Sequence, residues 1–234
     1  MEKRQKLYEG KAKIIYSTDN PDLVIQYFKD DATAFNAAKK GTVDEKGIMN
    51  NKISSKIFEF LISEGVPTHF EKSLSEREML VKKVEIVPVE VIIRNRAAGS
   101  LCRLLALPEG MQLKNTILEF CYKRDDLNDP LINEYHAKAL GLATEEELDA
   151  IRKHTFKVNE LLTKFFVKLN LELIDFKLEF GRYKGKIILA DEISPDTCRL
   201  WEVGTGKKLD KDRFRHDLGN IKEAYQEVLS RVSR

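Results

Sequence analysis

The stretch LIDFKLEFG, Leu173 to Gly181, alternates between two kinds of side chain. One parity is apolar and the other carries charge: Ile174, Phe176, Leu178 and Phe180 against Asp175, Lys177 and Glu179. A period of two predicts a β-strand whose apolar face packs on a core. The charged face has two interpretations, a solvated edge strand or a site that holds a metal ion and an anionic substrate.

The next segment, GRYKGKIILADE, predicts that this strand returns as a β-hairpin. We expect a three-residue loop, 183–185, in which Gly185 takes the left-handed position of a type I turn with a G1 bulge. In that register Lys177 faces Asp191 across the antiparallel ladder. Four charged residues then share one side of the sheet: Asp175, Lys177, Glu179 and Asp191. A shift of one residue would send Asp191 to the other face.

The charged face fits a site for a hard cation. Two carboxylates with a lysine between them suit magnesium that also contacts phosphate oxygens. The alternative is an exposed face of salt bridges, because surface ion pairs are common and weak. Apolar residues of the same parity argue against full exposure: Leu171, Leu173, Ile187 and Leu189. We therefore predict that this face is the floor of a cleft.

The amino-terminal YEGKAK carries a first signal for phosphate binding. Gly10 lies between two extended runs, and Lys11 and Lys13 share one face of the second run. Glycine lets the backbone approach a phosphate closely, and lysine supplies a point charge. A hairpin with surface lysines has the same pattern, so the motif alone does not decide.

The segment RNRAAGS gives a stronger signal, because it joins the end of an apolar strand to a short helix. Arg94 and Arg96 share one parity, and Ser100 is the expected N-cap. Free amides at a helix N-terminus beside an arginine form an anion site. Pairing of both arginines with acids on a neighbouring strand is the alternative. Asp196 and Arg199 in SPDTCRLW add charges directly after the hairpin.

The composition is that of a globular chain. Its 234 residues, 42% hydrophobic, suit one large α/β domain or two small ones. The 40 basic residues nearly cancel the 38 acidic ones, which indicates neither a nucleic-acid nor a membrane surface. Three widely spaced cysteines predict buried thiols, and four scattered histidines form no catalytic pattern. The opening residues lack a signal peptide, so the cytoplasm is the expected compartment.

The remaining elements predict an α+β fold. Strands surround one helix, about 48–62, in the first third, and an apolar strand then leads to the short helix SLCRLLAL. A polar, irregular region follows through KRDDLNDPLINE. A long helix begins at a capping box of Thr144 and Glu147 and closes near Asn170. After the hairpin we expect a loop through SPDTCRLWEVGTGKKL and one final helix, about 211–232.

Together, IVPVEVIIRNRAAGS and LIDFKLEFG resemble the two signature stretches of the SAICAR synthetase family of purine biosynthesis. The resemblance extends to YEGKAK, NDPLINE, DEISPDTCRLW and KDRFR in the family's order, and so covers essentially the whole chain. One departure is Asn128, where many members carry histidine before the Asp-Pro of the middle loop. Asp129 of that loop, and Lys123 before it, are candidate contacts for the ribotide or for aspartate.

The resemblance implies an ATP-dependent, amide-forming ligase. It would join L-aspartate to carboxyaminoimidazole ribotide and release ADP and phosphate. The implied architecture is an amino-terminal nucleotide-binding sheet domain, residues 1–83, and a larger α+β domain for substrate and metal, residues 84–234, with the ATP cleft between them. ATP and Mg²⁺ would be the cofactors. Family members commonly form homo-oligomers, but the sequence has no interface signature.

The resemblance also implies residue roles at the matching positions. The contacts to ATP would be Lys11, Ala12, Lys13, Lys82 and Val84, with the strand near Leu80 to Val84 presenting its backbone to adenine. The magnesium ligands would be Glu179 and Asp191. The ribotide, chiefly its phosphate, would be bound by Arg94, Ser100 and Arg199. The rest of the substrate pocket would be lined by Asp175, Lys177, Asp196 and Arg215, of which Asp175 and Lys177 are the candidate catalytic residues.

The residues favour amide ligation through an acyl phosphate, because a carboxylate is a poor electrophile until it is phosphorylated. The absence of a Ser, Cys or His constellation in the sequence agrees with positioning and electrostatics as the main contributions. Two alternatives stay open. A small-molecule kinase would use the same lysines and metal ligands, and a binding module would recognise nucleotides without consuming ATP. Phosphate release that requires aspartate separates the ligase from both.

Overall fold

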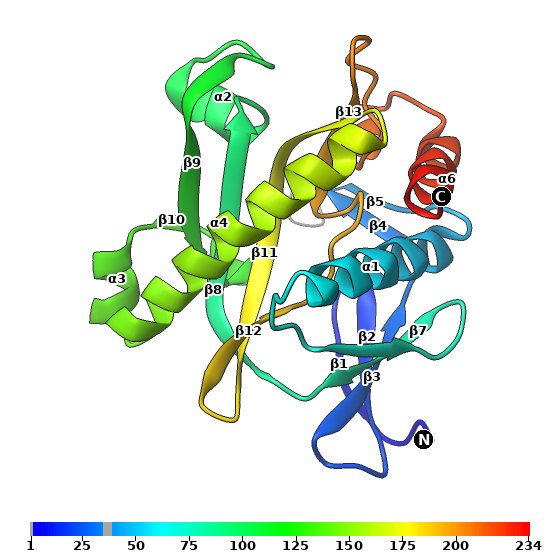
Figure 1. Cartoon of the computed structure of the whole chain (residues 1–234), viewed down its shortest axis with the longest axis vertical. Helices are drawn as coiled ribbons and strands as arrows, with labels where there is room; N and C mark the ends of the chain where they lie inside the picture. The colour runs from blue at the N-terminus through cyan, green and yellow to red at the C-terminus, as the bar shows by residue number, and fades with distance from the viewer. Residues whose placement is uncertain (1, 35–38) are drawn as a thin grey trace.

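Two larger antiparallel sheets carry the long helices α1 (Lys46–Ser63) and α4 (Glu145–Lys168) on the same side of the molecule (Figure 1). This computed structural model describes residues 2–34 and 39–234. The predicted α+β class is therefore confirmed. No helix within these two ranges is long and apolar enough to cross a membrane.

The first sheet has the strand order β1-β2-β3-β7-β6. Its strands are β1 (Lys6–Glu9), β2 (Lys13–Ser17), β3 (Leu23–Phe28), β6 (Phe70–Ser73) and β7 (Glu78–Lys82). Helix α1 packs on β3, β6 and β7. A separate ribbon pairs β4 (Asp31–Ala34) with β5 (Lys39–Thr42). The expected antiparallel sheet with one helix is thus confirmed for the first third of the chain.

The second sheet has the order β10-β9-β8-β11-β12, and β13 pairs with β11. Its strands are β8 (Glu85–Arg96), β9 (Gln112–Tyr122), β10 (Leu131–Ile132), β11 (Leu171–Tyr183), β12 (Lys186–Ala190) and β13 (Cys198–Glu202). Helix α4 packs on β8, β11 and β12. The short helices are α2 (Ser100–Leu105), a 3₁₀ turn (Asp125–Leu127), α3 (Glu134–Ala139), α5 (Asp212–Arg215) and α6 (Ile221–Val232).

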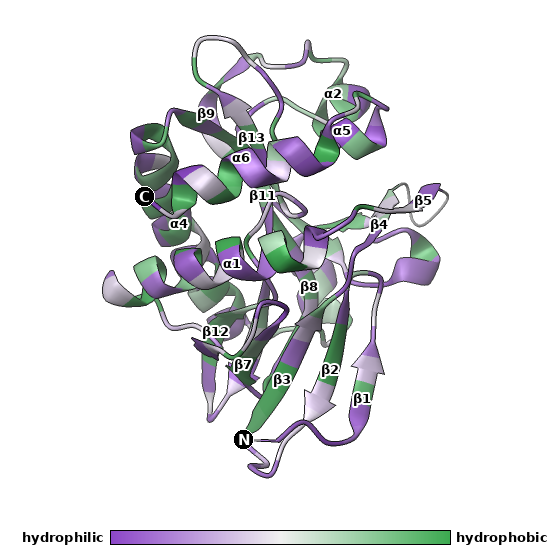
Figure 2. Ribbon diagram, turned by 90° about the vertical axis from the view of Figure 1, so that its right-hand side faces the viewer, coloured by the Kyte–Doolittle hydropathy of each residue, from purple (hydrophilic) through white to green (hydrophobic). Residues whose placement is uncertain are grey.

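Helix α4 begins and ends where the sequence predicts. The Thr144 hydroxyl accepts a hydrogen bond from the backbone N–H of Glu147 at 3.2 Å, and the Glu147 carboxylate accepts one from Thr144 N–H at 3.0 Å. Asn170 follows the helix with φ +58°, a conformation that asparagine tolerates. Figure 2 shows α1 and α6 as alternating hydrophilic and hydrophobic bands, as expected for helices with one buried face.

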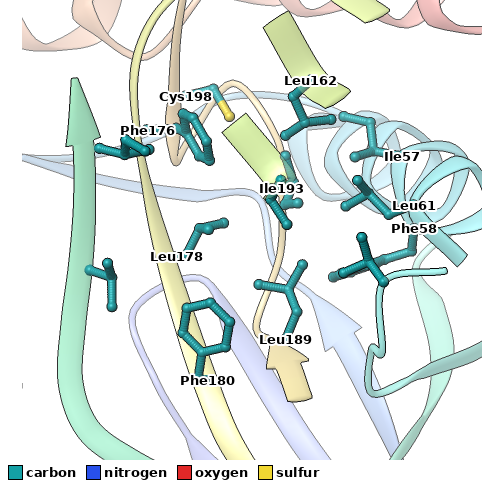
Figure 3. Packing of buried hydrophobic residues seen from close by; sticks show 14 of the residues in the cluster. Ile57, Phe58, Leu61, Leu162, Phe176, Leu178, Phe180, Leu189, Ile193 and Cys198 are labelled. Atoms are coloured by element: carbon teal, nitrogen blue, oxygen red, sulfur yellow. The ribbon is translucent and has the colours of Figure 1, made fainter. Parts of the chain in front are cut away.

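One hydrophobic core connects the two sheets. Phe58 of α1, Leu162 of α4, and Phe176 and Leu189 of the second sheet belong to the same buried cluster (Figure 3). Thr68 also forms a β-bridge with Leu189. The proposed domain boundary between residues 83 and 84 falls in the link between β7 and β8. It therefore separates two sheets that share a core.

The predicted register of the β11–β12 hairpin is wrong by one residue. Tyr183 pairs with Lys186, so the turn consists of Lys184 and Gly185 alone. Both turn residues have positive φ, +49° and +76°, as a type I′ turn requires. The twist of this two-residue turn matches the twist of the strands, which is why it is preferred over the longer loop. Lys177 consequently has no ladder partner in β12, whose last pair is Glu179 with Ala190.

Three further expectations about elements are wrong. The region taken as irregular contains β9, and the region taken as a loop contains β13. Both strands are held by long-range pairing, β9 with β8 and β13 with β11, which local sequence does not reveal. The single final helix is instead α5 and α6, because Asp217, Gly219 and Asn220 all take positive φ between them.

Candidate active site

Strands of both sheets line one cavity of about 830 Å³. Every residue that we assigned to nucleotide, metal or substrate lines it: Lys11, Ala12, Lys13, Lys82, Val84, Arg94, Ser100, Asp175, Lys177, Glu179, Asp191, Asp196, Arg199 and Arg215. These positions are spread over most of the chain, and the fold brings them together. Their grouping is therefore a property of the fold, whereas their individual roles remain predictions.

The cavity has an apolar wall, built mainly from the first sheet. The apolar residues there include Ile15, Val24, Val81, Val84 and Ile86. Val84 lies between the ladders of the two sheets, because the last pair of β7 is at Lys82 and β8 begins at Glu85. The Lys82 ammonium donates to the carbonyl of Thr68 at 3.0 Å. An apolar wall next to backbone outside a ladder suits a flat heterocyclic base.

Opposite charges gather on the cavity floor in what we call the lysine–carboxylate cluster. Its members are Lys13, Lys123, Lys177, Glu90, Glu179, Asp191 and Glu192. The Lys177 Nζ lies 2.5 Å from a carboxylate oxygen of Glu179, 2.8 Å from one of Glu90 and 4.0 Å from one of Asp191. Lys13 contacts both Asp191 and Glu192. Lys123 lies 3.0 Å from Glu179.

The cluster explains the protonation of its carboxylates. Burial by itself would raise the pKa of Glu179, but Lys177 and Lys123 outweigh burial and hold that pKa well below its ordinary value. Burial raises the pKa of Asp191, and the nearby charge of Glu179 raises it further against the effect of Lys13. A carboxylate with a raised pKa beside an ionised one indicates that this site would gain from additional positive charge.

The donor set fits a magnesium ion that is bound together with a nucleotide. No group of three or more carboxylate, histidine or cysteine side chains among the described residues forms a complete metal cage. Glu179 and Asp191 instead offer two carboxylates that both lie near Lys177. Magnesium is usually held by one or two carboxylates, water and phosphate oxygens. The predicted pair of ligands therefore agrees with the chemistry of the site.

An arginine cluster forms another part of the wall. Arg94 is 2% exposed and donates to Asp175 at 2.7 Å, to Glu119 at 2.8 and 2.9 Å, and to the Ser100 hydroxyl at 2.9 Å. Arg199 donates to the same Asp175 at 2.8 Å. Asp175 thus holds two guanidinium groups in a fixed arrangement, and its catalytic role stays a prediction.

The expectation that Ser100 caps α2 is wrong. Gly99 occupies the N-cap position with φ +56°, and no side chain caps the helix. The Ser100 hydroxyl instead accepts the hydrogen bond from Arg94. A Cβ at position 99 would lie 2.3 Å from Nη2 of Arg199, so glycine is needed for the close approach of this arginine. The alternative interpretation of RNRAAGS is confirmed, because Arg94 pairs with Glu119 and Asp175 and Arg96 pairs with Glu172. Arg94 also lines the cavity, so its binding of an anion stays a prediction.

The sequence did not assign several residues that line the cavity or hold its walls. Glu90, Glu192 and Lys211 line it without having been singled out. Glu119 of β9 was missed because β9 itself was not predicted. The alternating pattern of VEVIIR, which places Glu90 and Arg94 on one face, was the available signal for Glu90.

No protein nucleophile is evident in the cavity among the residues that the structure describes. Cys198 lines it, but burial raises the pKa of its thiol well above the ordinary value, so the reactive thiolate is disfavoured. Burial lowers the pKa of His69 to about 3, and its ring nitrogens have no hydrogen-bond partner among the described residues. Both groups are therefore poorly suited to attack a substrate or to shuttle protons at neutral pH.

Comparison with known proteins identifies the family. The SAICAR synthetase family model matches residues 6–232. A phosphoribosylaminoimidazole-succinocarboxamide synthase of Clostridium novyi is 63% identical over 100% of this chain and 99% of its own. The crystal structure of that synthase from Ehrlichia chaffeensis is 48% identical, with a TM-score of 0.96 over 98% of both chains. A SAICAR synthetase solved in complex with ADP is 47% identical, with a TM-score of 0.93 over 96% of both.

These matches cover nearly the full length of both partners, and they agree with a cavity in which lysines, arginines and paired carboxylates surround an apolar wall. The chain belongs to the SAICAR synthetase family, the ligases that join L-aspartate to a ribotide at the expense of ATP in purine biosynthesis.

Proposed function

We propose that this chain ligates L-aspartate to carboxyaminoimidazole ribotide through an acyl phosphate, and that the cavity described above holds all three substrates. The observation that carries this proposal is the convergence of every assigned residue on that cavity, whose walls provide an apolar surface and two separate groups of cations. ATP, the ribotide and aspartate are all anions, so separate cationic groups are what their simultaneous binding requires.

In this proposal ATP lies along the first sheet. Its base packs against the apolar wall and meets the backbone of Lys82 to Val84, and its phosphates extend toward Lys11 and Lys13. Lys11 is well placed at the mouth, since 39% of its side chain is exposed and it contacts Asp125 at 2.5 Å. Lys13 is more buried and contacts Asp191. The two lysines would therefore meet different parts of the triphosphate.

Glu179 and Asp191 would hold the magnesium that accompanies the nucleotide. The bound metal would offset negative charge on the transferring phosphoryl group. Lys177 supplies the counter-charge from the protein, because it contacts Glu179 and Glu90 and is half-buried on the cavity floor. This assignment makes Lys177 the candidate catalytic residue with the most direct access to the reacting phosphoryl group.

Arg94, Ser100 and Arg199 would bind the phosphate of the ribotide. Guanidinium groups match phosphate oxygens with paired hydrogen bonds. Asp175 keeps both arginines in place by accepting hydrogen bonds from each at 2.7 to 2.8 Å. Asp196 and Arg215 would complete the pocket for the substrates that are not nucleotide.

The reaction would proceed in two steps. An oxygen of the ribotide carboxylate attacks the γ-phosphorus of ATP, and ADP leaves. The amine of aspartate then attacks the acyl carbon, the C–O bond to phosphate breaks, and one proton is released. The half-buried lysines Lys13 and Lys177, held in place by their carboxylate partners, would stabilise the charge that develops in the first step. No covalent intermediate on the protein is needed.

The product distribution tests this function. Incubation with ATP, magnesium, the ribotide and aspartate should release phosphate only when aspartate is present, with one amide formed per phosphate. A phosphorylated ribotide that accumulates as a stable product without aspartate would identify a kinase. Tight nucleotide binding without any ATP consumption would identify a binding module.

A further inference from the structure

Asp210 is a buried carboxylate, between β13 and α5, to which no role has been given above. It is 0% exposed and does not belong to the lining of the described cavity. Its Oδ2 accepts a hydrogen bond from the backbone N–H of Leu200 at 2.9 Å, and its Oδ1 accepts one from that of Asp212 at 2.7 Å. Neither oxygen pairs with a lysine or arginine in the described part of the chain. A carboxylate buried in this way is costly, so its retention calls for an explanation.

The two backbone groups that Asp210 binds lie on either side of an ion pair. Leu200 directly follows Arg199 in β13, and Asp212 is the first residue of α5. The Nε of Arg199 donates to Oδ2 of Asp212 at 2.8 Å, and Asp212 is itself only 1% exposed. By accepting from both backbones, Asp210 fixes α5 against β13. It therefore fixes the Arg199–Asp212 pair without touching either side chain's charged group.

This pair determines the direction of the Arg199 guanidinium. Its Nε is held by Asp212, and its Nη1 donates to the two oxygens of Asp175 at 2.8 and 2.9 Å. The remaining nitrogen, Nη2, makes no hydrogen bond with the described residues and lies against Gly99, where an added Cβ would be 2.3 Å away. A guanidinium is planar, so two fixed nitrogens set the direction of the third. Nη2 is thus the donor of Arg199 that is left for a ligand.

The surroundings of Asp210 allow it to exchange a proton near neutral pH. Titratable groups interact with it from three elements: Asp212 of α5, Arg199 and Cys198 of β13, and Tyr225 of α6. Burial and then the charge of Asp212 raise the pKa of Asp210 to about 7, against the two backbone hydrogen bonds and Arg199. Burial would also raise the pKa of Asp212, but Arg199 lowers it to about 2. Asp212 therefore stays ionised while Asp210 titrates.

Ionised and protonated Asp210 differ as anchors. A carboxylate offers an acceptor oxygen to each of the two N–H groups, whereas protonation turns one oxygen into a hydroxyl, a poorer acceptor. We propose that Asp210 in its ionised form is a positioning residue for the ribotide phosphate, because it anchors the Arg199–Asp212 pair that directs Nη2 of Arg199. The inference rests on the proposed function, in which Arg199 binds that phosphate. Asp210 touches no substrate itself.

The KM for the ribotide in Asp210→Asn, measured from pH 6 to pH 8.5, tests this role. The amide keeps one acceptor oxygen and so resembles the protonated acid. The ratio of the variant's KM to that of the wild type cancels the titration of the ribotide itself. This ratio should be about tenfold at pH 8.5 and about twofold at pH 6, where most of the wild-type Asp210 is already protonated. The KM for ATP should stay within about twofold throughout.

Asp30→Asn is the matched control. The Asp30 carboxylate also accepts from a backbone N–H, that of Gly47 at 2.9 Å, but it pairs with Arg77 and does not belong to the described cavity lining. Burial would raise the pKa of Asp30, but Arg77 holds it below the ordinary value, so Asp30 stays ionised from pH 6 to pH 8.5. Its ratio of KM values for the ribotide should not change with pH.

A measurement on the wild type does not depend on the folding of any variant. Carboxyl-carbon NMR of protein with ¹³C-labelled aspartate follows the ionisation of Asp210, with its signal assigned through the backbone of that residue. Because linkage is reciprocal, a tenfold preference of the ribotide for the ionised form requires that the ribotide lower the pKa of Asp210 by about one unit. ADP with magnesium should leave this pKa unchanged.

Three results would overturn the assignment. The first is a ratio of ribotide KM values that is the same at pH 6 and pH 8.5, and the second is an equal rise in the KM for ATP, which would indicate a general structural defect. The third is a pKa of Asp210 that the ribotide does not move. Failure of the ligase function itself would be seen differently, as wild-type protein that releases no aspartate-dependent phosphate at any pH.

Discussion

His69 offers a prediction whose magnitude follows directly from the structure. Its side chain belongs to the cavity lining but is only 3% exposed, with its ring edge-on to Phe58 at a centroid distance of 5.2 Å. Burial, followed by the charges of Lys13 and Lys82, lowers its pKa from 6.5 to about 3. The folded protein therefore keeps this imidazole neutral under conditions in which the unfolded chain protonates it.

The sign and size of the effect follow from proton linkage. Below pH 6.5 the unfolded state binds one more proton at His69 than the folded state, so stability falls as the pH falls toward 3. At pH 4.5, roughly 2 units below the pKa of His69 in the unfolded chain, this effect lowers the free energy of unfolding by about 2.7 kcal/mol, since each pKa unit corresponds to about 1.36 kcal/mol. Above pH 6.5 His69 is neutral in both states, and its effect on the free energy of unfolding vanishes.

His69→Gln isolates this contribution, because glutamine is similar in size and does not titrate. Urea unfolding at pH 7.5 and at pH 4.5 should show that the wild type loses about 2 to 3 kcal/mol more than the variant over this interval. The Cε1 proton of His69 should keep one NMR chemical shift from pH 8 to pH 4.5. Parallel pH dependences of the two proteins, or a normal histidine titration, would refute the reasoning.

Four other perturbations test the site and the core. Glu179→Gln should lower kcat for aspartate-dependent phosphate release by at least about 100-fold, with an unchanged Tm, because a carboxylate for the metal is lost. Removal of magnesium with EDTA should abolish the same reaction, and added magnesium should restore it. Gly99→Ala should raise the KM for the ribotide by about tenfold, with the KM for ATP unaffected, because the new Cβ displaces the Arg199 guanidinium. Phe176→Ala should reduce the free energy of unfolding by about 3 to 5 kcal/mol in urea titrations, because it empties a position that is 2% exposed.

The local sequence predicts those parts of the fold that local interactions determine. The capping box of α4 needs only Thr144 and Glu147, and the apolar face of β11 needs only alternation. By contrast, β9 and β13 exist because β8 and β11 provide partners far away in the sequence. Because β9 was not predicted, Glu119 on this strand was not recognised as one of the two acids that hold Arg94.

The candidate site was predictable in its residue types but not in its contacts. Charged residues at spacing two indicate a charged face, yet the same pattern fits a row of salt bridges or a binding site. In the structure the salt bridges and the cavity occur together, because Lys177, Arg94 and Arg199 all form ion pairs and all line the cavity. Only the burial of these pairs distinguishes a charged binding site from a row of salt bridges on the surface. Surface pairs contribute little, whereas buried pairs beside a cavity keep charges in place for a ligand.

Asp191 lines the cavity near Lys177 although the predicted register of its hairpin was wrong. The predicted pairing placed it opposite Lys177 within the ladder, but β12 ends at Ala190 and Asp191 lies beyond the last pair. Its φ of +64° turns the chain out of the strand, and the carboxylate then reaches Lys13 and comes within 4.0 Å of Lys177. A left-handed conformation costs a non-glycine residue roughly 1 to 2 kcal/mol, least for aspartate and asparagine. The positive φ therefore aims the Asp191 side chain at the lysines of the cavity floor, and its role as a metal ligand stays a prediction.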